Sequence, residues 1–239
     1  MSNRRREPTS TLLAQVARLV KLIADADLPP SVSYLLIGGS LTAIHKDDRA
    51  TQATNAATGT PDPVRSINSG STFLKQGLRC MTKHKSFDEV KAVVSTVNYG
   101  LGFRSGPEVM AHLTRALVAG GYAVNTQDDA IKGFYRLLRQ ALLDGVDELW
   151  PEANKHFEAY YGPAAPCVYS YKDEAGNQTA RVSFSTEGTR AGCVLGSAGF
   201  DIALHHFVYR HLVAEFPSFT IKALTDDMPS FFTAQTDDD

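Results

Sequence analysis

The chain has 239 residues, 43% of them hydrophobic and 21% charged, with a net charge of −2. This length is sufficient to bury a substantial core as one large domain or two small ones, and no apolar run reaches the 20 or so residues that a membrane helix needs. The three cysteines, Cys80, Cys167 and Cys193, stand far apart without a CxxC pair, which argues against a disulfide framework and against a zinc site. The composition therefore predicts an intracellular protein, cytoplasmic or nuclear, with no membrane partner.

The two parts of the chain differ in charge. Residues 1–85 hold 12 Lys and Arg against 6 Asp and Glu, whereas the remaining residues hold 12 against 20. This asymmetry predicts a basic lobe joined to an acidic one. Two differently decorated solvated faces would give the same counts, and charge alone favours that simpler interpretation.

The first half of the sequence predicts mainly helices. The segment 10–28 has an apolar stripe at helical spacing and ends at paired prolines, and the segment 69–81 has similar spacing. Residues 47–63 are small and polar, which predicts a mobile loop. A further helix is expected over 105–121, with Ser105 and Glu108 forming a capping box.

The second half alternates between strands and helices. A strand is expected over 122–128, followed by a helix over 129–146 with an apolar stripe at Ile131, Phe134, Leu138 and Leu142. Alternating segments around a Gly-Asn turn predict a hairpin over 167–186. A long helix follows over 197–216. Two strands over 219–225 and 230–236 then place the sequence DDMP at a hairpin tip.

Two pairs of adjacent aspartates stand at these predicted strand ends. Asp128 and Asp129 lie where a strand meets a helix, and Asp226 and Asp227 lie at the hairpin tip. Adjacent carboxylates repel each other unless a cation lies between them. Each pair alone is more typical of a cap or a turn. At the edge of one sheet, the two pairs together would suit the two divalent ions that phosphoryl-transfer enzymes hold, because Mg²⁺ prefers carboxylate oxygens.

Six segments, taken in order, resemble the fingers and palm of reverse transcriptases, in particular those of retrotransposons without long terminal repeats. The resemblance runs from about Leu28 to Ser230, and its segments are IHKDD, PVRSINSGS, NYGLGFRSGPEVMAHLTRAL, DAIKGFYR, EGTRAGCVLGSAGFDIALH and ALTDDM. The paired aspartates alone are not specific. The order and spacing of the segments carry the resemblance.

The resemblance implies an α+β fold with two regions. Residues 1–115 would form a mainly helical fingers-like region, with the N-terminal helix and the loop 47–63. Residues 116–239 would form a polymerase-type palm, an antiparallel sheet with helices packed on one face, truncated after the third palm motif. The thumb is absent from this expected architecture.

The resemblance also implies the metal ligands. Asp129 and Asp226 would ligate two Mg²⁺ ions, for which Mn²⁺ can substitute, and Asp227 would be the adjacent, weaker ligand. Asp129 is preferred to Asp128 because Phe134 then falls at the family's aromatic position, where it packs against the place of a ribose 2′-hydroxyl. Without the resemblance, Phe134 would be interpreted as a core residue of an amphipathic helix.

Nucleotide-binding roles follow by position. Lys46 and Arg65 would grip the incoming triphosphate, although either residue alone is also an ordinary surface cation. Ala130 would border the nucleotide next to the metal ligand, and Gly192 would let template or nucleotide approach the backbone. An RNA-dependent RNA polymerase is disfavoured because this chain has Phe134 where such enzymes usually have an aspartate.

The function predicted on this basis is that of an RNA-directed DNA polymerase domain of a retroelement, a nucleotidyltransferase with an RNA template, a DNA primer and dNTPs as partners. The chain departs from the family at Ala191, where glutamine is usual, and at Lys132, where asparagine often follows the metal ligand. Few residues follow Asp227, so a longer chain or a partner would have to supply the thumb. Two alternatives stay open: a non-catalytic nucleic-acid-binding or assembly module derived from a polymerase, and a fragment of a longer reading frame.

Overall fold

The computed structural model describes residues 7–45, 64–129, 133–217, 219–225 and 227–233. The helices in these ranges are α1 (Glu7–Ala24), α2 (Pro30–Ile37), α4 (Thr72–Met81), α5 (Lys85–Val94), α6 (Gly106–Ala119), α7 (Gly133–Arg136), α8 (Arg139–Leu149), α9 (Asn154–Tyr161), α10 (Gly196–Leu204) and α11 (Arg210–Glu215). The strands are β1 (Gly39–His45), β2 (Val64–Gly70), β3 (Tyr122–Asp129), β4 (Ala165–Lys172), β5 (Gln178–Ser185), β6 (Phe219–Ile221) and β7 (Asp227–Thr233). No helix in the described ranges has the length and apolar character needed to cross a membrane.

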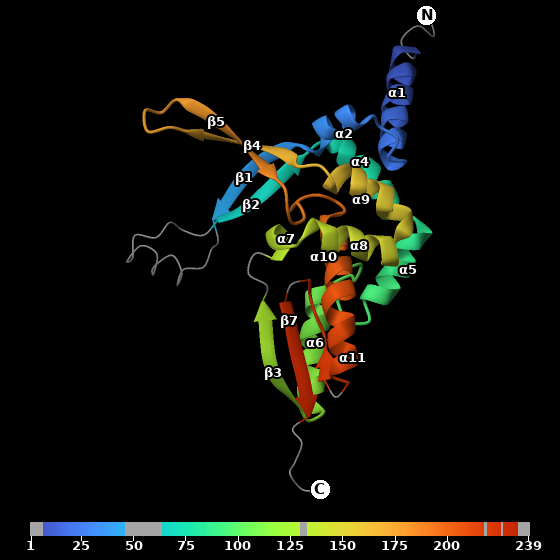
Figure 1. Ribbon diagram of the computed structural model, residues 1–239, viewed down its shortest axis with the longest axis vertical. Helices are drawn as coiled ribbons and strands as arrows, with labels where there is room; N and C mark the ends of the chain where they lie inside the picture. The colour runs from blue at the N-terminus through green and yellow to red at the C-terminus, as the bar shows by residue number, and fades with distance from the viewer. Residues whose placement is uncertain (1–6, 46–63, 130–132, 218, 226, 234–239) are drawn as a thin grey trace, which may run out of the picture.

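The strands form two sheets, which Figure 1 shows at opposite ends of the molecule. The first sheet has the order β2-β1-β4-β5, and only β1 and β4 run parallel within it. Two of its strands come from residues 39–70 and two from residues 165–185. The sheet therefore unites segments from both sides of the boundary expected near residue 115. The β4–β5 hairpin projects away from the body (Figure 1).

The second sheet has the order β3-β7-β6 and is antiparallel throughout. Its strands β3 and β7 pair over their whole length, with one irregularity between Val124 and Thr126. Helix α6 packs against β3, and α11 packs against β6. This antiparallel sheet with its helices, together with the mainly helical remainder, confirms the predicted α+β fold with a palm-like part.

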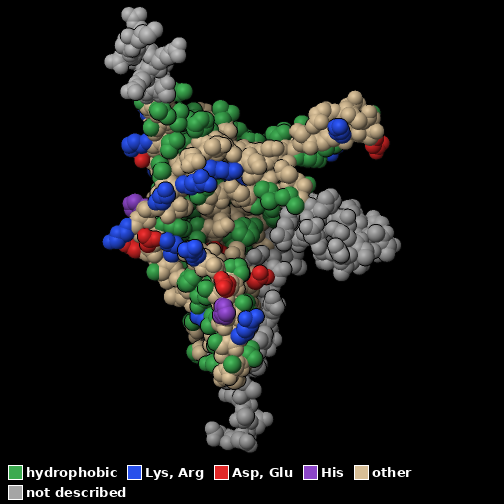
Figure 2. Space-filling model, turned by 180° about the vertical axis from the view of Figure 1, so that it is seen from behind, with side chains coloured by type: hydrophobic (Ala, Val, Ile, Leu, Met, Phe, Trp, Pro, Cys, Tyr) green, Lys and Arg blue, Asp and Glu red, His purple; other side chains and the backbone are tan. Residues whose placement is uncertain are grey.

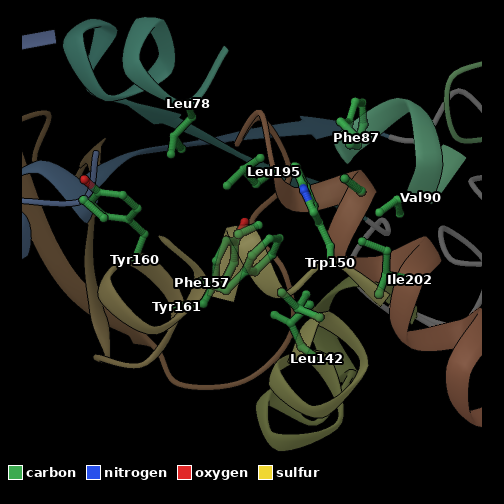
Figure 3. Packing of buried hydrophobic residues seen from close by; sticks show 14 of the residues in the cluster. Leu78, Phe87, Val90, Leu142, Trp150, Phe157, Tyr160, Tyr161, Leu195 and Ile202 are labelled. Atoms are coloured by element: carbon green, nitrogen blue, oxygen red, sulfur yellow. The ribbon is translucent and has the colours of Figure 1, made fainter. Parts of the chain in front are cut away.

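Most of the apolar core lies among helices α4, α5, α8, α9 and α10 (Figure 3). Trp150 is fully buried there, with its ring centroid 4.8 Å from that of Phe87. Its indole N–H donates to Ser86 Oγ at 2.9 Å, so the polar edge of the ring is satisfied as well. A second, smaller cluster lies beside the three-stranded sheet and consists of Val97, Tyr209, Ile221 and Ala223.

The space-filling view from behind shows how charge is distributed on that face. Lys and Arg side chains gather across its upper middle, over the helical body, and Asp and Glu side chains lie at the edge of this group, lower down and at the tip of the projecting hairpin (Figure 2).

The helix expected over 129–146 is wrong as a single element. The described part is divided into α7 and α8, with Leu138 in an extended conformation between them. The reason is that Phe134 and Leu137 offer their carbonyls to a neighbouring loop, which donates from the backbone N–H groups of Thr189 and Gly188. As a result, Leu138 is 67% exposed while Leu142 is buried, so the two residues do not share one apolar face.

The capping box at Ser105 is also wrong. Ser105 has a left-handed backbone, with φ 60°, and its side chain makes no capping hydrogen bond. The long helix expected over 197–216 is present but changes register, because a π-helical segment, His205–Tyr209, separates α10 from α11. The 167–186 hairpin, the helices over 10–28 and 69–81 and the presence of a last strand pair are confirmed. The placement of DDMP at the hairpin tip is wrong, because β7 begins at Asp227 and pairs with β3 from that residue on. Strands β1 and β2 and helices α2, α5 and α9 were not predicted.

Candidate functional site

The register between β3 and β7 brings two of the expected motifs together. Asp129 is the partner of Asp227 in this ladder, and Asp128 is the partner of Met228. Directly opposed residues of antiparallel strands share a face of the sheet. Two sequence positions almost 100 residues apart therefore meet at one end of the palm-like sheet, as the aspartate pairs predict, and Asp227 is exposed there.

Not every predicted site residue can be placed. Lys46, Ala130 and Asp226 lie outside the described residues, as does the whole of the loop expected over 47–63. Arg65 is placed by its backbone in β2, opposite Ile44 of β1. Among the side chains that the structure describes, no group of three or more His, Cys, Asp or Glu residues could hold a metal ion. Metal binding through Asp226 therefore stays a prediction.

The turn before Asp227 is held by polar contacts. Leu224 and Asp227 exchange two backbone hydrogen bonds, of 2.8 and 3.1 Å, and Thr225 has a left-handed φ of 59°. Asn98, which is fully buried, accepts from the backbone N–H of Thr225 at 3.0 Å and donates to its carbonyl at 3.2 Å. Tyr209 donates its hydroxyl to the same carbonyl at 2.9 Å. The conformation of the hairpin tip is therefore stabilised by hydrogen bonds from Asn98 and Tyr209.

Phe134 lies where two segments of the resemblance meet: residues 129–136, here called the first motif, and residues 187–205, called the second motif. The loop between β5 and α10, residues 186–195, is called the second-motif loop. The Phe134 ring stacks on Phe200 of α10, with centroids 4.4 Å apart and planes inclined by 12°. Phe200 is buried, whereas Phe134 is only partly covered. The Phe134 carbonyl accepts from Thr189 N at 2.6 Å, which joins α7 to the second-motif loop. A partly open ring on a rigid support is suited to contact a ligand, and its role against a ribose stays a prediction.

The second-motif loop packs directly on β2. Ala191 accepts a backbone hydrogen bond from Asn68 at 3.0 Å, and a Cβ built at Gly192 would lie 2.5 Å from the Asn68 carbonyl oxygen. Gly192 also has φ +96°, so glycine is required here by both backbone conformation and space. The close approach seen at Gly192 is thus to the chain itself, and an approach by template or nucleotide stays a prediction.

A cleft of about 240 Å³ lies between this loop and the four-stranded sheet. Its lining includes Ser66, Asn68, Tyr135 and Arg190, and Tyr135 donates its hydroxyl to the Ser66 carbonyl. Arg190 is buried, with its guanidinium 4.5 Å from the ring centroid of Tyr161 and a hydrogen bond to the Tyr160 carbonyl.

Arg139 ties the cleft to the helical core. Its guanidinium donates to the carbonyls of Tyr161, Pro163 and Ser185 at 2.8 to 2.9 Å, and its Nε donates to the Gly188 carbonyl at 3.4 Å. Burial lowers the pKa of Arg139, with a further contribution from the charge of Arg190. The second-motif loop is therefore connected to the end of β5 and the end of α9.

Sequence reasoning missed the residues behind the hairpin tip. Asn98 is the first residue of the segment NYGLGFRSGPEVMAHLTRAL, which contributes to the resemblance, but nothing in its local pattern identifies its partner Thr225. Asp201 gave a clearer signal, because it is the only acid in the apolar run SAGFDIAL. It is fully buried and accepts from the Asn98 amide at 3.1 Å.

No protein-family model and no curated protein matches the sequence. Similar folds are found among solved structures of telomerases. An apo telomerase from Candida tropicalis matches with a TM-score of 0.51 and 12% identity, over 87% of this chain and 41% of that one. A Candida tropicalis telomerase truncated from its C-terminal domain matches with a TM-score of 0.50 and 14% identity, over 84% and 44%.

The telomerase from Candida albicans, solved in complex with a fragment of telomeric RNA, gives a TM-score of 0.50 and 14% identity over 87% of this chain and 38% of that one. The chain thus spans less than half the length of the structures it matches. The chain has a reverse-transcriptase-like fold. At this identity the likeness to telomerases shows the fold alone, and it does not distinguish telomerases from the retrotransposon enzymes.

Proposed function

We propose that this chain is the fingers and palm part of an RNA-directed DNA polymerase of a retroelement, which adds deoxynucleotides to a primer. The observation that carries the proposal is the β3–β7 register, which makes Asp129 the partner of Asp227 within a reverse-transcriptase-like fold. An RNA template, a DNA primer and dNTPs would be its partners. The RNA-bound telomerase from Candida albicans supports a nucleic-acid partner by analogy.

The donor set at the end of the palm-like sheet suits magnesium. Asp129, Asp226 and Asp227 offer only carboxylate oxygens, which hard divalent cations prefer, and Asp227 is open to solvent. Two Mg²⁺ or Mn²⁺ ions bound there would supply activation of the primer 3′-hydroxyl and neutralisation of the departing pyrophosphate. The carboxylates themselves would hold these cations at the end of the sheet, and the bound cations would offset the repulsion between the acids and the phosphates of the nucleotide.

Other residues of the chain would orient the nucleotide. Phe134, supported by its stack on Phe200, would exclude a 2′-hydroxyl and so favour deoxynucleotides. Lys46 and Arg65 would bind the triphosphate from the fingers. Ala130 and Gly192 would border the nucleotide without side chains that obstruct it.

Titration of Mn²⁺ into the purified chain, with and without a dNTP, tests the metal site directly. We expect Asp129→Asn and Asp226→Asn to weaken binding by about tenfold or more, because each removes a charged ligand. Glu174→Gln is the matched control, since it removes one exposed acid in the β4–β5 turn. In a version supplied with a thumb, the two Asp variants should also abolish magnesium-dependent primer extension. Retained extension would remove these residues from the mechanism.

A second candidate is a non-catalytic nucleic-acid-binding or assembly module derived from a polymerase. One observation favours it: β2 already packs against the backbone of Ala191 and Gly192, where a template or nucleotide would have to approach. RNA binding that is indifferent to Mn²⁺ and to Asp226→Asn would support this module over the polymerase.

A further inference from the structure

Asn98 occupies an unusual place in the fold. Residues 97–99 run alongside Ala223, with a parallel bridge between Asn98 and Ala223. Ala223 donates to the Val97 carbonyl, and Tyr99 donates to the Ala223 carbonyl, each at 2.8 Å. The chain leaving α5 thus adds a short backbone contact to the segment that leads into the hairpin tip.

The side chain of Asn98 uses its full hydrogen-bonding capacity. Its amide nitrogen donates to Asp201 Oδ1 at 3.1 Å and to the Thr225 carbonyl at 3.2 Å. Its Oδ1 accepts from the backbone N–H groups of Gly100 at 2.8 Å and Thr225 at 3.0 Å. Two donors and two acceptors are all that a carboxamide offers, and the donors and acceptors around it fix its orientation.

We propose that Asn98 is the positioning residue of the hairpin tip: its buried carboxamide bonds both backbone groups of Thr225 and so fixes the turn that leads to Asp227 at the start of β7. Thr225 adopts a left-handed conformation that a β-branched residue rarely takes, so the conformation has to be imposed by its surroundings. Asn98 engages both backbone groups of Thr225, and Tyr209 adds a second donor to its carbonyl.

Asp201 provides the remaining hydrogen-bond partner of the Asn98 side chain. It is buried on α10, and its Oδ1 accepts from the amide of Asn98. A buried amide and carboxylate are costly to place in a protein interior unless each is satisfied, so this pair specifies one geometry. The functional part of the inference, that the geometry serves metal binding, rests on the proposed function. The structural part, that Asn98 holds the turn, does not.

An amide–carboxylate exchange between positions 98 and 201 tests the inference in the full chain. Asn98→Asp keeps an acceptor for Thr225 N–H but removes both donors and faces a second carboxylate. We expect backbone amide exchange with deuterium around Thr225 to become about tenfold faster, and Mn²⁺ affinity to fall about 10- to 100-fold. The double variant Asn98→Asp with Asp201→Asn restores one amide–carboxylate hydrogen bond. It should recover part of both losses, because the repulsion between the two carboxylates is removed but the donor to the Thr225 carbonyl is not restored.

Tyr160→Phe is the control for a loss of stability without a change at the turn. It removes a buried hydrogen bond, from the tyrosine hydroxyl to the Ile23 carbonyl at 3.1 Å, in the helical core. Mn²⁺ affinity and exchange at Thr225 should stay at the level of the unmodified chain. If Tyr160→Phe weakens Mn²⁺ binding as much as Asn98→Asp, the effect is general destabilisation and the inference is overturned.

The two parts of the inference can fail separately. Unchanged exchange at Thr225 in Asn98→Asp overturns the positioning role. If Asp226→Asn leaves Mn²⁺ binding unaltered, the proposed function fails, and faster exchange at Thr225 would still support Asn98 as the residue that holds the turn. If Asn98→Asp does not fold, Asn98→Ser is the second variant, because it removes the carboxamide that bonds both backbone groups of Thr225 without adding a charge. Exchange there should then rise about two- to fivefold, and no rise overturns the inference.

Discussion

The helical core around Trp150 and the three-stranded sheet are stabilised in different ways. Among the described residues, the core cluster contains 20 buried apolar residues, whereas the cluster beside the sheet contains four. The hairpin tip next to this smaller cluster is held instead by the hydrogen bonds of Asn98 and Tyr209. Apolar burial is non-directional, but hydrogen bonds fix orientation. The comparison indicates that one region supplies stability and the other supplies geometry.

Trp150→Ala should have the largest effect on stability. We expect the free energy of unfolding to fall by about 3 to 5 kcal/mol, because the substitution leaves a cavity and removes the donor to Ser86. Ile221→Ala, in the smaller cluster, should cost about 2 kcal/mol, near the low end of such substitutions. Urea denaturation measures both, and Phe184→Ala, at a 55% exposed position, is the control. If Ile221→Ala lowers the free energy of unfolding as much as Trp150→Ala does, apolar burial stabilises both regions equally and the comparison is wrong.

Gly188→Ala tests the connection between the two regions. Gly188 has φ +67°, and a Cβ there would lie 2.4 Å from the Phe134 carbonyl oxygen. Gly176, in the β4–β5 turn, has φ +83° but nothing within 4 Å of such a Cβ. Gly176→Ala should therefore cost about 1 to 2 kcal/mol for its backbone conformation alone. Gly188→Ala should cost at least about 1 kcal/mol more, because backbone must also shift.

Thermal unfolding of the two glycine variants would sharpen the comparison further. Equal losses of stability in the two variants would mean that the second-motif loop can shift at little cost and does not hold α7 to the rest of the molecule. We expect a larger loss of stability for Gly188→Ala, which would show that this loop connects α7 rigidly to the rest of the molecule.

The smallest expected effect is a pH dependence to which each region contributes one histidine. Burial lowers the pKa of His156, which contacts the Ala24 carbonyl at 2.6 Å, and burial also lowers the pKa of His205 in the π-helical segment. The unfolded chain, with histidine pKa values near 6.5, then binds more protons than the folded chain. Stability should therefore be fully present above about pH 6.5 and decrease as the pH falls below it.

Denaturation at several pH values between 5 and 8 measures this slope. His156→Gln and His205→Gln should each flatten it, because glutamine does not titrate. A slope that neither substitution alters would show that other groups dominate the pH dependence.

Local signals in the sequence predicted local structure well. The hairpin over 167–186 followed from alternation and a Gly-Asn turn, and Gly176 does adopt a positive φ there. The paired aspartates, through their order along the chain, predicted that two distant motifs would meet, and the β3–β7 register makes Asp129 the partner of Asp227.

Contacts between distant segments could not be read in the same way. The parallel pairing of β1 with β4 and the hydrogen bonds of Asn98 depend on partners more than 100 residues away, and no local pattern specifies them. The break after α7 had the same origin, because the helical carbonyls of Phe134 and Leu137 were taken by residues 188 and 189. The roles of side chains that depend on such distant partners can be identified only from the structure.

The parallel pairing of β1 with β4 has a consequence for the order of synthesis. Gly39 and Ser40 pair with Cys167 and Val168, and β1 lies between β2 and β4 in the sheet. While the ribosome is still making the intervening residues, β1 has one unsatisfied edge, which is a template for association with other chains. The four-stranded sheet can therefore form completely only after β4 and β5 have been synthesised.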